Sequence, residues 1–133
     1  MSVQQSSHFL RRVLILDAVA SGATAALLVA AAGLIHGMLG LPLSLLRGAG
    51  LVLLPYVAFV AFVATRERIG PAAVWVIIVS NGLWASASVL LLLLGAIAPK
   101  GLGIAFVVAQ AAVVALLGEL QYMGLRRPPA LAT

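Results

Sequence analysis

Four long apolar runs divide the chain, and short breaks with proline, glycine or charged residues separate them. Each run has about the 20 residues with which an α-helix crosses a ~30 Å hydrocarbon core. None of them alternates polar and apolar positions as a barrel strand does. The pattern predicts an all-α membrane protein with four transmembrane helices, at residues 13–35, 44–65, 71–97 and 102–125.

The breaks between the runs have the composition of helix ends. Pro42 and Pro71 suit the first turn of the helices that follow them, and Gly70 suits the end of a helix. Because short links join consecutive helices as antiparallel neighbours, we expect an up-down bundle. The prediction is a single domain over residues 1–133, with flexible tails at 1–10 and 128–133.

Composition agrees with a membrane protein and excludes several chemistries. Hydrophobic residues make up 64% of the chain and charged residues 8%, against about 25% charged in a typical soluble domain. The chain has no cysteine, which excludes disulfides, thiolate metal sites and cysteine nucleophiles. The net charge of +5 comes from basic residues that flank apolar runs, which is a topology signal and not a nucleic-acid footprint.

The basic residues predict an orientation. Six arginines fall on one side of a four-span bundle, and only Arg47 and Lys100 fall on the other. The positive-inside rule then places both termini of this multi-pass protein in the cytoplasm. Since Asp17 interrupts the first apolar run, we interpret that run as a retained helix and not as a signal peptide. The six topology determinants are Arg11, Arg12, Arg66, Arg68, Arg126 and Arg127.

Polar side chains inside the spans are the candidate functional positions. On the first span Asp17, Ser21 and Thr24 follow each other at helical spacing and form one stripe. At 1.5 Å per residue, Asp17 lies about 8 Å above Arg12 and Glu119 about 10 Å above Arg126. The two acids are therefore predicted at nearly the same depth.

The remaining candidates lie deeper. Thr24, Tyr56, Asn81 and Gln110 give each helix one polar group near the middle of the membrane, about 15 to 24 Å above the arginines. Asn81, Trp84 and Ser88 share one helix face, and Gln110 and Gln121 share another. Glu119 points about 180° away from Gln110, which argues against a single polar channel through the bundle.

Each candidate has a structural and a functional interpretation. Asp17 either pairs with an arginine on an interior face, acts as a protonatable acid on an ion or substrate path, or lies in an oligomer contact. Glu119 forms a salt bridge with Arg126, Arg127 or Arg68, or relays protons with Asp17. Asn81 and Gln110 form interhelical hydrogen bonds or line a small-molecule pocket.

No motif in the sequence predicts catalysis, a metal site or a cofactor. There is no glycine-rich phosphate loop, no GxSxG and no HExxH, and the loops are too short for a catalytic domain. His8 and His36 lack metal-ligand spacing. The chain is therefore not expected to be an enzyme; if it were one, Asp17 and Glu119 acting on a lipid head group would be the best candidates.

Three stretches carry a resemblance to a known group of proteins. They are GLVLLPYVAFVAFVATR, NGLWASASVLLLL and LGIAFVVAQAAVVALLGELQYMGLRR. They resemble an uncharacterised family of small four-helix integral membrane proteins of bacteria, which implies a location and an architecture but no functional residues. In size and span count the chain also resembles small multidrug-resistance transporters, which carry an essential acid in their first helix. Their acid lies deeper than Asp17 and their aromatic residues are spaced differently.

Two functional hypotheses follow. The first is a non-enzymatic structural or accessory component of the inner membrane, which self-associates or docks on a larger membrane complex through its small residues. The alternative is a proton-coupled carrier of a small or lipophilic solute that works as a homodimer. In that case Asp17 binds the proton, while Asn81, Trp84 and Gln110 line the site.

Overall fold

A computed structural model describes residues 2–95 and 97–126, with side chains from His8 onward. The described residues form helices and contain no strand, which confirms the predicted all-α class. Four helices are long and apolar enough to cross a membrane, the first of them over His8–Ala30. The five helices are α1 (Ser2–Ala30), α2 (Ala32–Leu39), α3 (Leu43–Thr65), α4 (Pro71–Leu93) and α5 (Gly101–Arg126).

The helix ends differ from the apolar runs in three places. The first run is divided at Ala31, where the backbone leaves the helical conformation and the short α2 begins. At the start of the chain, α1 is helical from Ser2, where the sequence predicts a flexible tail. The third apolar run, predicted to reach residue 97, forms α4, which ends at Leu93 because Gly95 adopts a left-handed conformation with φ of 68°. The predicted tail at 128–133 lies outside the described residues.

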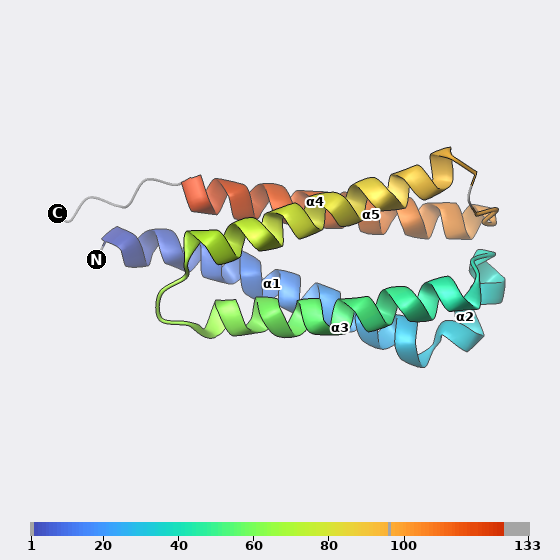
Figure 1. Cartoon of the computed structure of the whole chain (residues 1–133), viewed down its shortest axis with the longest axis horizontal. Helices are drawn as coiled ribbons and strands as arrows, with labels where there is room; N and C mark the ends of the chain where they lie inside the picture. The colour runs from blue at the N-terminus through green and yellow to red at the C-terminus, as the bar shows by residue number, and fades with distance from the viewer. Residues whose placement is uncertain (1, 96, 127–133) are drawn as a thin grey trace.

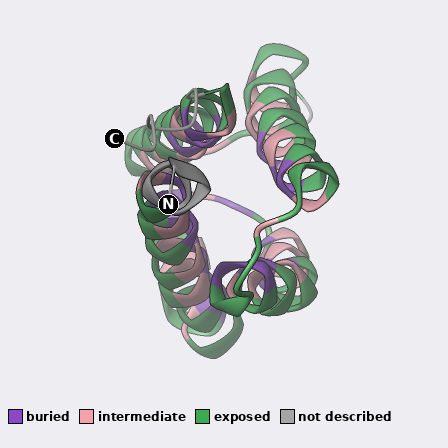
Figure 2. Ribbon diagram, turned by 90° about the vertical axis from the view of Figure 1, so that its left-hand side faces the viewer, coloured by how far each residue is buried: buried purple, intermediate pink, exposed green. Residues whose placement is uncertain are grey.

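The helices form two pairs that meet along α1 and α5. α1 packs against α3, α4 packs against α5, and α3 and α4 make few contacts with each other. Figure 1 shows the start of α1, the α3–α4 loop and the last turn of α5 at one end of the molecule, here called the terminal end. α2 and the α4–α5 connection lie at the opposite end, the α2 end. Figure 2, viewed from the terminal end, shows α4 beside α5 and apart from α3.

Packing is uneven along the bundle. α4 contributes three buried residues, Val74, Ile77 and Asn81, and all three lie in its first half. From Gly82 to the end of α4 every described residue is half-buried or exposed. The core at the terminal end is formed by Leu10, Leu14, Val60, Val63, Ala64, Val74 and Ile77. The core at the α2 end comes almost entirely from the other helices: Ala25, Leu28, Ala32, Leu39, Leu41, Leu46, Leu53 and Val107.

The α2 end is closed by a backbone contact between α2 and α5. The Lys100 N–H donates to the carbonyl oxygen of Leu39 at 2.9 Å. A Cβ at Gly103 would lie only 2.0 Å from that same oxygen, so this position requires glycine. This contact joins the two helix pairs at the end where α4 leaves the core.

At the terminal end an arginine joins α1 to α3. Arg11 donates to the backbone carbonyl of Ala64 and, at 3.2 Å, to that of Glu67. The last carbonyls of a helix have no partner within it, so the guanidinium satisfies the Ala64 carbonyl in the last turn of α3 and also holds the loop that follows at Glu67. The other arginines predicted to determine topology belong to the first half of α1, the α3–α4 loop and the last residue of α5; Arg127 lies outside the described residues.

Candidate functional site

Asp17 is completely buried in the middle of the four long helices. One turn further along α1, the hydroxyl of Ser21 donates to Asp17 Oδ1 at 2.8 Å. The predicted stripe therefore begins as a hydrogen-bonded pair. Thr24 does not extend it, since its hydroxyl donates to the carbonyl of Ala20 in its own helix at 2.8 Å.

Each of the three other long helices supplies one donor to Asp17 Oδ2. Tyr56 on α3 donates from its hydroxyl at 2.7 Å, and Asn81 on α4 donates from Nδ2 at 3.2 Å. Gln121 on α5 donates from Nε2 at 2.6 Å. These four residues and Ser21 form the Asp17 cluster, the place where α1, α3, α4 and α5 are joined by side-chain hydrogen bonds.

The members of the Asp17 cluster also bond to one another. Asn81 Nδ2 donates to Gln121 Oε1 at 2.9 Å, and the Tyr56 hydroxyl lies 2.9 Å from Asn81 Oδ1. Because Tyr56 has one hydroxyl proton, it donates either to Asp17 or to Asn81 at a given moment. No buried side-chain nitrogen or oxygen of the described residues lacks a hydrogen-bond partner. Every polar side-chain atom of the cluster thus has a hydrogen-bond partner, and the Tyr56 hydroxyl proton has two alternative acceptors.

All the partners of Asp17 in the described part of the chain are uncharged. The interpretation in which Asp17 pairs with an arginine does not agree with this geometry, since Arg11 donates to the end of α3 instead. A buried charge is expensive unless donors surround it, and four donors meet the two oxygens of Asp17. When the carboxyl group is neutral, Ser21 Oγ can accept its proton, while Asn81 and Gln121 continue to donate to Oδ2.

A second set of polar side chains joins α4 to α5 farther toward the α2 end. Trp84 Nε1 donates to Gln110 Oε1 at 2.8 Å. Gln110 Nε2 donates to Ser88 Oγ at 3.0 Å and to the carbonyl of Val107 at 2.9 Å. These side chains, Trp84, Ser88 and Gln110, form the Gln110 cluster, and all three are half-buried.

Two adjacent cavities lie between the helices. The first has a volume of about 320 Å³, and its polar floor includes Ser21, Tyr56 and Asn81. The second has a volume of about 410 Å³ and extends past Leu41 and Ser44 toward the α2 end. Both are lined by Thr24, Trp84, Phe106 and Gln110, and no described residue that lines either cavity is charged.

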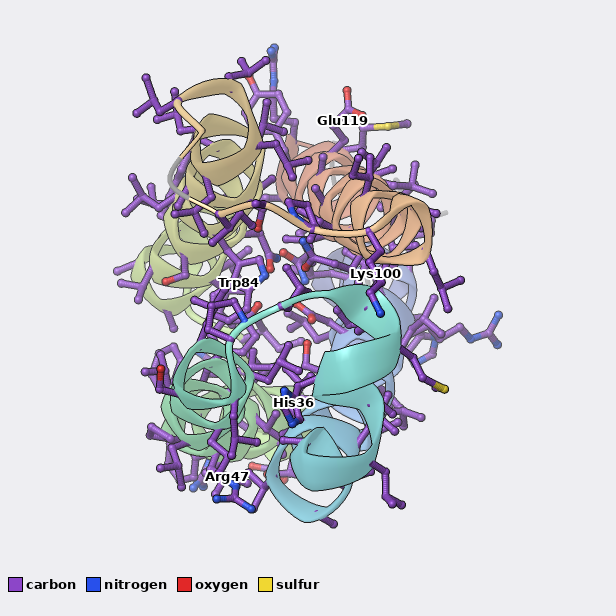
Figure 3. The ribbon with its side chains drawn as sticks, turned by 90° about the vertical axis from the view of Figure 1, so that its right-hand side faces the viewer. His36, Arg47, Trp84, Lys100 and Glu119 are labelled. Carbon is purple, nitrogen blue, oxygen red and sulfur yellow. The ribbon has the colours of Figure 1, made fainter. Side chains whose placement is uncertain are left out.

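The structure separates the two acids of the transmembrane helices. Figure 3, viewed from the α2 end, shows Glu119 pointing outward from α5, while Trp84 lies on the inner side of α4. Glu119 is exposed and has no hydrogen bond or ion pair within the described residues. Arg126, one of its predicted partners, contacts Tyr122 instead, with a 3.0 Å hydrogen bond. The described geometry therefore gives no path for a relay between Asp17 and Glu119.

Sequence reasoning missed one member of the site. Gln121 is completely buried and donates the shortest of the hydrogen bonds to Asp17, yet it was not among the candidates. The signal was present, because Gln121 shares the helix face of Gln110. Its depth, five residues before Arg126, matches that of Asp17, five residues after Arg12.

The described residues contain no group of three or more histidine or acidic side chains that could hold a metal ion. Comparison of the chain with models of protein families, with curated proteins and with solved structures finds no match. The resemblance to small bacterial four-helix proteins therefore stays a prediction, and the functional argument rests on the geometry of the Asp17 cluster and the cavities.

Proposed function

We propose that the chain is a non-enzymatic, multi-pass protein of a bacterial inner membrane, folded as an antiparallel up-down bundle with cytoplasmic termini. The distribution of basic residues supports this orientation. Arg66 and Arg68 lie in the loop at the terminal end and Arg126 lies at the end of α5, whereas Lys100 belongs to the opposite connection. A reporter fused after Thr133 should be exposed to the cytoplasm, and a periplasmic signal would overturn the orientation.

We further propose that the protein binds a small lipophilic solute inside the membrane and couples this binding to a proton on Asp17, as a proton-coupled carrier does. One observation carries the proposal. Three of the four residues that donate to Asp17 also form the floor of the first cavity. A change in the charge of Asp17 therefore changes the donors that a solute in the cavity would meet.

The coupling works through Tyr56 and Asn81. When Asp17 is ionised, both side chains direct a proton toward its carboxylate. A proton on Asp17 removes the negative charge, so that the Tyr56 hydroxyl is free to donate to an acceptor atom of the solute. Solute and proton then favour each other's binding, and by linkage the effect is reciprocal. Acidic residues within transmembrane helices commonly serve proton pathways.

The proposal is tested by the pH dependence of binding. The probe is 1-aminoanthracene, an uncharged fluorophore that becomes brighter in apolar cavities, added to the purified protein in detergent micelles. We expect saturable binding whose affinity falls by up to about tenfold per pH unit as Asp17 loses its proton. In Asp17→Asn the binding should persist without this pH dependence, because the amide can accept where Oδ2 accepts and donate to Ser21.

Glu119→Gln is the matched control, since it removes the same charge from an exposed side chain. Its pH profile should equal that of the unmodified chain. Absence of saturable binding by the unmodified chain would contradict the proposal. A pH dependence that survives in Asp17→Asn would remove Asp17 from the coupling.

The accessory role remains a second candidate, which we propose on a different observation. The second half of α4 has no buried residue, so one face of a transmembrane helix is available to a second copy or to a larger complex. Energy transfer between two differently labelled copies in vesicles tests self-association. Transfer that rises with the protein-to-lipid ratio to a plateau supports a specific oligomer, and transfer at the level of random encounters contradicts it.

A further inference from the structure

The cavity lining indicates what kind of solute fits. None of the described lining residues is charged, so an ionic group there would lose its hydration without gaining a counter-charge. Most of the lining is aliphatic or aromatic. Four further polar side chains of the lining hydrogen bond to their own helices or to each other: Thr24, Ser80, Trp84 and Gln110. The floor formed by Ser21, Tyr56 and Asn81 is therefore the place for a polar group of the solute. The solute that matches is therefore uncharged, with one polar end and an apolar remainder.

The two cavities together also indicate how a long solute would be oriented along the bundle. Along α3 the lining runs from Tyr56 beside the polar floor to Ser44 near the α2 end, which is about 18 Å at 1.5 Å per residue. Phe106 and Trp84 line both cavities, so a chain that extends from the floor passes between these two aromatic side chains. This shape is long and narrow and matches a single alkyl or isoprenoid chain.

The second cavity reaches the outer surface between α3 and α4. Gly48 and Val52 line it from α3, and Ala87 and Leu91 line it from α4. Val52 is 61% exposed and Ala87 is also exposed, and this is the side on which the two helices make few contacts. For membrane-spanning helices, that side faces the hydrocarbon of the bilayer.

An ordinary phospholipid does not satisfy the polar floor. Tyr56 lies nine residues from the end of α3, about 14 Å along the helix, so a charged head group held at the membrane surface cannot reach its hydroxyl. A small uncharged head group, such as a hydroxyl or a carbonyl, can leave the surface together with its chain.

Resting on the proposed function, we infer that the solute is an uncharged single-chain amphiphile that enters from the bilayer between α3 and α4. Its polar head accepts a hydrogen bond from Tyr56, and its chain lies between Trp84 and Phe106.

The head-group contact is tested by comparing dodecanol with dodecane, as competitors that displace 1-aminoanthracene. Tyr56→Phe should weaken displacement by dodecanol about tenfold, the effect of one lost hydrogen bond, and leave dodecane unchanged. A merely structural role of Tyr56 would weaken both competitors alike, and that result would overturn the assignment. If the probe binds with the Asp17-dependent pH profile but dodecanol does not displace it, this inference fails while the proposed function stands.

The lateral path is tested through Trp84. In Trp75→Phe, Trp84 is the sole tryptophan of the chain. In vesicles, a mid-chain brominated dodecanol should quench Trp84 in a saturable manner, more strongly than brominated phosphatidylcholine at equal bromine content. Gly48→Leu, at a lining position where a Cβ meets no atom within 4 Å, should slow or abolish this quenching.

Gly82→Leu is the matched control, because it places the same side chain at an equally open position of α4 that lines neither cavity. It should leave the quenching unchanged. Equal quenching by the two brominated lipids, or no difference between the Gly48 and Gly82 variants, would show only lipid exposure of Trp84 and would overturn the inference.

Discussion

The two halves of this bundle differ in how they are packed. At the terminal end, aliphatic side chains from all four long helices surround the Asp17 cluster. From this cluster toward the α2 end, α4 leaves the core, and two cavities lie between it and the other helices; the first begins at the cluster and the second continues to Leu41 and Ser44. In lipid there is little hydrophobic drive to close such spaces, because lipid tails are as apolar as the side chains.

Specific contacts decide where the helices meet. Hydrogen bonds to Asp17 hold four helices together at one level, and a backbone contact that requires Gly103 closes the opposite end. Between these two points the α3–α4 side has no equivalent connection among the described residues. The packed half therefore positions Asp17, the proposed proton-binding group, and the open half contains the cavities in which we propose that a solute binds.

Truncation of one leucine in each half should give the largest difference in the loss of unfolding free energy. Leu14 is completely buried at the terminal end, so Leu14→Ala should lower the free energy of unfolding by about 2–4 kcal/mol. Leu45 already borders a cavity, and Leu45→Ala should cost about 1 kcal/mol or less, because it removes fewer contacts. Detergent-induced unfolding of both variants measures the difference, and equal losses would contradict uneven packing.

Removal of one amide in each half should give the next largest effect. Gln121→Leu takes away a donor to Asp17 and an acceptor for Asn81, and should cost about 2 kcal/mol because the partners stay buried. Gln110→Leu should cost about 1 kcal/mol or less, since its partners Trp84 and Ser88 are half-buried. The same unfolding experiment compares the two variants. A larger loss for Gln110→Leu would contradict the conclusion that the Asp17 cluster stabilises the bundle more than the Gln110 cluster does.

A smaller effect is expected at the closed α2 end. Gly103→Ala places a methyl group against the carbonyl of Leu39 and should cost about 1–2 kcal/mol by forcing α2 and α5 apart. Hydrogen exchange at the Lys100 amide, which donates to that carbonyl, should become faster. Gly48→Ala, at a position with free space, is the control and should leave the exchange unchanged. Unchanged exchange in Gly103→Ala would mean that this contact does not close the bundle.

The smallest effect is expected at the exposed acid. Glu119→Gln should change the unfolding free energy by less than about 0.5 kcal/mol, because Glu119 has no polar partner in the described residues. Unfolding titrations at two pH values measure this. A loss comparable to that of Gln121→Leu would show a role for Glu119 that the fold does not explain.

The sequence predicts the four long helices because length and hydropathy determine which segments can cross a bilayer. It also singles out Asp17, Ser21, Tyr56 and Asn81, since polar groups are rare in such segments. It does not predict that they meet. At 1.5 Å per residue a continuous helix from Arg68 would put Asn81 about 20 Å from that arginine, but Arg68 lies in a loop and α4 begins at Pro71, so the helical distance is about 15 Å.

Helix rotation and the break after α1 were beyond the sequence pattern. Glu119 and Asp17 have similar depths, yet only packing decides that one points outward and the other inward. The break at Ala31 lies in a run of alanine and glycine without a polar residue or proline. α2 is instead positioned by its contact with α5, a tertiary interaction that a local pattern does not contain.

In the proposed mechanism a solute in the cavity and a proton on Asp17 bind together. Infrared difference spectroscopy measures this directly, because a protonated carboxyl group has a carbonyl band that a carboxylate lacks. Addition of dodecanol at a pH where Asp17 is partly ionised should produce this band in the unmodified chain and in Glu119→Gln, and not in Asp17→Asn. A spectrum in which solute binding produces no such band, or produces it equally in Asp17→Asn, would contradict the account.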